Sequence, residues 1–114
     1  MKSQHSRNVG LTFSQLEAKH LSMFLQRMLE GNHRKFNPDV LEAAQEKLAD
    51  ARALALWLRE KVALELQPRE AIEVLEALAA DLATEGLPPE AHASLAGVRD
   101  ELAASLPRRV AVRT

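Results

Sequence analysis

The sequence contains no cysteine, which excludes disulfide bonds, zinc–thiolate sites and cysteine nucleophiles. Aromatic residues make up only 4% of the chain, and the β-branched residues that strands prefer are few. The four glycines are scattered, so no glycine-rich phosphate-binding loop is present. No hydrophobic run is long enough to span a membrane, and the polar first ten residues show no secretory signal. These absences favour a cytoplasmic protein with no membrane association.

Alanine and leucine dominate the chain of 114 residues, which is 46% hydrophobic and 27% charged. This length predicts one domain, and this composition predicts an all-α globular fold. Arginine outnumbers lysine, which together with the abundant alanine and leucine indicates a GC-rich bacterial genome. We expect a flexible N-terminal segment over residues 1–11, a helical domain over 12–106 and a basic C-terminal tail over 107–114.

Local start and stop signals divide the chain into four helices. Residues 12–15 form a Thr-x-x-Gln capping box, and Gly31 supplies a helix stop. Residues 37–38, Asn-Pro, provide an N-cap and a first-turn proline, and the next breaker is the proline of residues 67–68. Gly86 and two prolines then separate the last two helices. The predicted helices are 13–30, 38–66, 68–85 and 87–106, arranged as two consecutive hairpins in a four-helix bundle-like domain with one long helix.

The long predicted helix carries two apolar faces. Its inner stripe has the alternating three- and four-residue spacing of shallow helix packing. The stripe consists of Leu41, Ala44, Leu48, Ala51, Ala55, Leu58 and Val62. Leu54, Trp57 and Leu64 lie on the opposite face, which a small core does not need. Trp57 has two interpretations, a core residue or an interface residue, and we favour the interface because Leu54 and Leu64 share its face.

The other helices differ in how much of their circumference is apolar. Helix 13–30 is apolar on most sides, which predicts a central position or contact with a second chain through Phe24 and Met28. Helices 68–85 and 87–106 each show one narrow apolar stripe. The predicted inward residues are Ile72, Leu75, Ala79 and Leu82 in the third helix and Ala91, Leu95, Val98, Leu102 and Leu106 in the fourth. The predicted outward acids of the third helix are Glu70, Glu73, Glu76 and Asp81.

Charge is unevenly distributed along the chain. Residues 1–35 carry six Lys/Arg against two Asp/Glu, whereas residues 65–101 carry two against nine. The last thirteen residues are basic again. This asymmetry predicts that the two ends of the chain bind an acidic partner. The contacts would come from the basic residues of the first interhelical loop and of the tail. The candidate contacts to phosphates or an acidic partner are Arg34, Lys35, Arg108 and Arg109.

Two acidic motifs are the candidates for metal chemistry. Glu17 and His20 have the Glu-x-x-His spacing of carboxylate-bridged metal sites, but a second copy is missing. Glu70, Glu73 and Glu76 resemble a magnesium-binding series in spacing, although their predicted face is the solvated one. No serine has a base partner at a recognisable spacing. We therefore predict no catalytic residue, no metal site and no cofactor.

The absence of a recognisable catalytic or metal-binding motif, together with more apolar helix surface than one small core needs, favours a non-enzymatic protein-interaction module. We expect a small bacterial regulatory or adaptor protein, a homodimer, that binds and masks a partner protein as anti-activators and secretion chaperones do. The predicted partner-binding residues are Leu54, Trp57, Leu64, Phe24 and Met28. The alternatives are a nucleic-acid-associated accessory protein and a carboxylate–metal helical enzyme.

Overall fold

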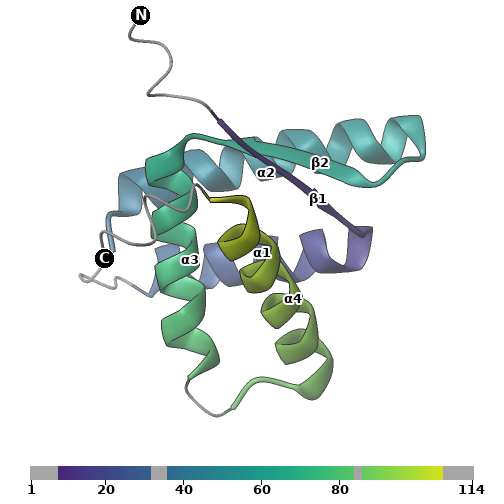
Figure 1. The fold of residues 1–114 in the computed structure, drawn as a ribbon. Helices are drawn as coiled ribbons and strands as arrows, with labels where there is room; N and C mark the ends of the chain where they lie inside the picture. The colour runs from purple at the N-terminus through teal and green to yellow at the C-terminus, as the bar shows by residue number, and fades with distance from the viewer. Residues whose placement is uncertain (1–7, 32–35, 84–85, 107–114) are drawn as a thin grey trace, which may run out of the picture.

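The computed structural model describes residues 8–31, 36–83 and 86–106. Within them the chain forms four helices and a small antiparallel sheet of two strands (Figure 1). The elements in chain order are β1 (Val9–Phe13), α1 (Gln15–Glu30), α2 (Pro38–Leu58), β2 (Val62–Leu66), α3 (Pro68–Leu82) and α4 (Pro89–Ser105). The mostly helical fold and the four helices are therefore confirmed. The two strands are a feature that the sequence analysis missed.

The sheet pairs two segments that lie about fifty residues apart in the sequence. Val9 pairs with Leu66 and Phe13 with Val62, so the strands run antiparallel. In both strands every second side chain is buried, which is the period of a strand with one face on a core. The inward residues are Val9, Leu11, Phe13, Val62, Leu64 and Leu66. The prediction of a flexible segment over residues 1–11 is therefore wrong for 9–11, since their alternate side chains are buried.

The start of α1 lies two residues later than predicted, because Thr12 belongs to β1. Ser14 is the N-cap, and its hydroxyl accepts a hydrogen bond from the Glu17 backbone N–H at 3.1 Å. The Glu17 carboxylate accepts one in return from the Ser14 N–H at 3.0 Å. This is a capping box. At the other end Gly31 follows the last helical residue, as predicted, but with φ −79° and not in the left-handed region.

The end of α2 is the largest departure from the sequence prediction. The helix begins as predicted, with the Asn37 side chain accepting from the Asp39 N–H at 2.9 Å, but it ends at Leu58 and not at Leu66. Arg59 adopts the left-handed conformation with φ 59° and ψ 46°. The Glu60 N–H donates to the Ala55 carbonyl at 2.9 Å, which closes a Schellman motif. An arginine occupies the position that glycine usually takes, so the sequence carries no visible breaker there.

The buried face of α3 is rotated from the predicted one. The buried residues are Glu70, Ala71, Val74, Ala77, Leu78 and Leu82. Ile72 and Leu75 are half-buried and Ala79 is exposed, so three of the four predicted inward positions are wrong in degree or in kind. At the first turn of α3, Glu70 faces α2 and pairs with Lys47 at 2.7 Å. In α4 the predicted Leu95, Val98 and Leu102 are buried, whereas Ala91 and Leu106 are only half-buried.

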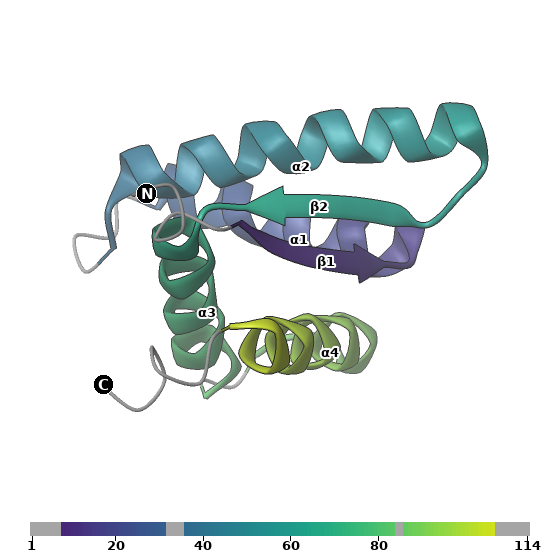
Figure 2. The same ribbon diagram turned by 45° about the horizontal axis from the view of Figure 1, so that its top comes forward.

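The core lies between the sheet and the helices. α2 runs alongside β2, α1 packs against α2 and α4, and α3 crosses the direction of α2 (Figure 2). Five residues of α1 are buried: Ala18, Leu21, Phe24, Leu25 and Met28. The C-terminal turn of α2 lies at one end of this arrangement, where the chain turns back into β2 (Figure 2).

Candidate interaction surface

The structure divides the five predicted partner-binding residues into two groups. Leu54 and Trp57 lie on the surface, with 59% and 81% of their area exposed. Phe24 and Met28 are buried because α1 packs between its neighbours, and Leu64 is buried because it is on the inner face of β2. These three belong to the hydrophobic core, which corrects their assignment to a binding surface. The site that remains is at the C-terminal end of α2.

Two further residues extend this surface. Leu56 is 71% exposed and Leu58 is 45% exposed, although Leu58 was assigned to the inner stripe of the long helix. Leu58 is outside the core because α2 ends at this residue, and the buried positions that follow are in β2. We define the apolar α2 end as Leu54, Leu56, Trp57 and Leu58. The unbroken run of apolar residues from 54 to 58 was the available signal, since one face of a helix cannot bury them all.

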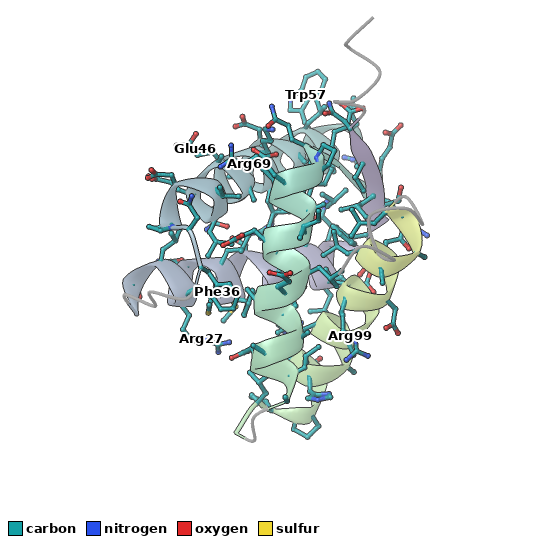
Figure 3. All side chains as sticks on the ribbon, turned by 60° about the vertical axis from the view of Figure 1, so that its left-hand side comes forward. Arg27, Phe36, Glu46, Trp57, Arg69 and Arg99 are labelled. Carbon is teal, nitrogen blue, oxygen red and sulfur yellow. The ribbon has the colours of Figure 1, made fainter. Side chains whose placement is uncertain are left out.

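The apolar α2 end combines a projecting ring with a neighbouring depression. Trp57 lies at the outer margin of the molecule in Figure 3. A hollow of about 260 Å³ lies between the start of α1 and the second half of α2, and we call it the α2 hollow. Its lining residues are Gln15, Ala49, Arg52, Ala53 and Leu56. Ala49 and Ala53 are exposed, and because their side chains are small, the surface of α2 is recessed at these positions.

Charge on the outward side of α2 changes sign along the helix. Asp39, Glu42, Glu46 and Asp50 are all exposed and lie in the first two thirds of α2. Acidic residues near a helix N-terminus are favourable because of the helix dipole. Arg59, Glu60 and Lys61, immediately after the helix, are also exposed. The outward side therefore runs from acidic, through the apolar α2 end, to a segment with one net positive charge.

Three of the four acidic residues that were considered for metal binding have structural partners. Glu17 belongs to the α1 capping box, and Glu73 accepts a hydrogen bond from the Asn37 backbone N–H at the start of α2. Glu70, predicted to point outward, is only 5% exposed and pairs with Lys47 at 2.7 Å. Among the described residues, no group of three or more His, Asp or Glu side chains is placed to hold a metal ion.

A second cavity, of about 340 Å³, lies between α1 and the start of α4. Its lining includes His20, Phe24, Arg27 and Leu95. Arg27 is paired with Asp81 at 2.8 Å, and its guanidinium lies 5.8 Å from the centre of the Phe24 ring. Its cation is therefore already engaged within the chain.

The four predicted phosphate or acidic-partner contacts, Arg34, Lys35, Arg108 and Arg109, lie outside the described residues. Within the described ranges, no helix combines the length and the hydrophobicity needed to cross a membrane. Comparison of the chain with protein-family models, with curated proteins and with solved structures found no match. The apolar α2 end is therefore the candidate interaction surface among the described residues.

Proposed function

We propose that this protein is a non-enzymatic interaction module that binds another protein chain through the apolar α2 end. One observation carries the proposal: four large apolar side chains, 45% to 81% exposed, lie within the last five residues of α2. Single exposed leucines are ordinary on protein surfaces. A cluster of exposed apolar side chains that contains a tryptophan is typical of protein–protein interfaces.

The functional class that fits this surface best is a small regulatory or adaptor protein of the bacterial cytoplasm, which binds and masks a partner protein. Charged residues on both sides of the patch would orient an approaching partner, since rim charges act mainly on specificity and association rate. The structural use of Glu17, Glu70 and Glu73 favours this class over a carboxylate–metal enzyme. Each of these carboxylates accepts a hydrogen bond from the backbone within the chain.

The proposal is tested by capture of partner proteins on the immobilised chain from an extract of the source organism. A double variant, L54S/W57S, removes apolar area from the apolar α2 end without touching the core. The matched control is Met23→Ser, which changes an exposed apolar residue of α1 (57% exposed). We expect one set of proteins to be retained by the wild type and the control and lost from the double variant. Equal retention by all three proteins would contradict the proposal.

A further inference from the structure

We infer that the apolar α2 end docks on a second copy of this chain, with the two α2 helices antiparallel about a two-fold axis near Ala53. This inference rests on the proposed function, because it names the partner of the same surface. A symmetric dimer of this kind requires a self-complementary patch, in which a residue that contacts another is contacted by it in return. Both the shape and the charge of the outward side of α2 meet this requirement.

The ring of Trp57 and the α2 hollow beside it are complementary in shape. Trp57 lies four residues after Ala53, and Ala49 lies four residues before it. In an antiparallel pair centred on Ala53, Trp57 of each copy therefore reaches the level of Ala49 in the other copy. There the α2 hollow, of about 260 Å³, offers space that two alanine side chains leave open. The arrangement is a knob packed into a hole, made twice by symmetry.

The charges on the outward side of α2 favour the antiparallel direction. At about 1.5 Å per residue, Glu46 lies about 10 Å before Ala53 along the axis, and Arg59 lies at about the same distance after it. An antiparallel pair therefore brings Arg59 of one copy to Glu46 of the other. A parallel pair would set the exposed acids of both helices side by side, and like charges in contact are unfavourable.

The size of the patch limits the strength of this dimer. Stable interfaces commonly bury about 800 Å² on each partner, and one helix turn with a neighbouring hollow supplies less than that. We therefore expect an association that depends on protein concentration. Trp57→Ala should raise the dissociation constant at least tenfold, since a central tryptophan is the typical hot spot of an interface.

Oxidative cross-linking tests the arrangement directly, because the chain has no cysteine of its own. A single Ala53→Cys substitution puts one thiol next to the proposed two-fold axis. Two thiols form a disulfide only when their Cα atoms come within about 7 Å. We expect Ala53→Cys to give a covalent dimer at protein concentrations where the matched control, Ala80→Cys on the exposed side of α3, does not. Equal cross-linking of both variants would overturn the arrangement.

A charge exchange tests the direction of the pair. Glu46→Arg and Arg59→Glu should each weaken self-association, and the double variant E46R/R59E should restore it, because both proposed contacts are then rebuilt with reversed sign. A double variant that associates no better than the single variants would overturn the antiparallel direction.

Sedimentation of the wild type separates this inference from the proposed function. A monomer at concentrations well above micromolar would overturn the second copy as partner, and loss of captured proteins from L54S/W57S would then still support binding of a different protein. A dimer that cross-links through Ala53→Cys, with no protein captured from the extract, would support the second copy and contradict the adaptor role.

Discussion

At the scale of single residues, Trp57 and Phe24 show that two similar side chains can differ completely in burial. Trp57 is 81% exposed on α2, whereas Phe24 is 1% exposed on α1. Both are large aromatic residues in predominantly apolar stretches of helix, and the sequence analysis assigned both to partner binding. The difference is set by what packs on each helix face. A lone helical pattern does not contain that information.

This contrast gives a stability prediction for the two aromatic residues. Trp57→Ala should change the free energy of unfolding by less than about 0.5 kcal/mol, as for other surface substitutions. Phe24→Ala should cost about 3–5 kcal/mol, because it opens a cavity in the core. Urea denaturation followed by circular dichroism, at a protein concentration low enough to keep the chain monomeric, measures both values. A large loss for Trp57→Ala would show that the ring packs on the chain's own core.

A second residue-scale prediction concerns Glu70, the buried acid of α3. Its carboxylate accepts hydrogen bonds from Lys47 at 2.7 Å and from the Gln67 backbone N–H at 2.8 Å, so it joins α2 to the first turn of α3. Glu70→Ala should therefore destabilise the fold by about 1–2 kcal/mol. Glu76→Ala, at an exposed position on the same helix, is the control and should cost less than about 0.5 kcal/mol. Equal effects of the two substitutions in the same denaturation assay would contradict the structural role of Glu70.

At the scale of elements, the junction between α2 and β2 decides the fold. The sequence has neither glycine nor proline between residues 38 and 68, so helical periodicity continued through Val62 in the prediction. The same residues also fit a strand, because residues 62–66, like residues 9–13, have a large apolar side chain at every second position and a small or polar one between. Five residues are too few for periodicity alone to choose between the two. The choice is made by pairing between distant segments.

The left-handed residue at this junction gives a prediction for the element. A residue with a Cβ costs about 1–2 kcal/mol in the left-handed region, and glycine avoids that cost but loses more entropy on folding. Arg59→Gly should therefore stabilise the protein by about 0.5–1 kcal/mol. The rise in melting temperature is measured at a protein concentration low enough to keep the chain monomeric, because Arg59 also takes part in the proposed dimer contact. Lys61→Gly, at a position outside the left-handed region, is the matched control and should not raise it. A lower melting temperature for Arg59→Gly would contradict the proposed geometry of the helix end.

At the scale of the whole molecule, local sequence signals were enough to predict the helices, whereas the sheet is determined by contacts between distant segments. The Asn37 cap and the prolines at helix starts are encoded within a few residues, which is why the starts of α2 and α3 and the number of helices were predictable. The sheet depends on pairing between residues 9–13 and 62–66, which no local pattern shows. The exposure of Leu54 and Trp57 was predictable because both lie on α2, whose start and apolar faces are local patterns. The burial of Leu64 was not predictable because it depends on the pairing of β2 with β1. The bundle arrangement stays a prediction.

The proposed dimer also makes the stability of the whole molecule depend on concentration. A partner that binds only the folded chain stabilises it by mass action, so dimerisation should raise the melting temperature as protein concentration rises. Trp57→Ala should shift this dependence to at least tenfold higher protein concentration, and below that range it should melt at the temperature of the dilute wild type, because the substitution leaves the core intact. Met23→Ser, outside the interface, should keep the dependence. Thermal unfolding of the three proteins over a wide concentration range, followed by circular dichroism, measures this, and a wild-type melting temperature that stays constant over that range would contradict the dimer.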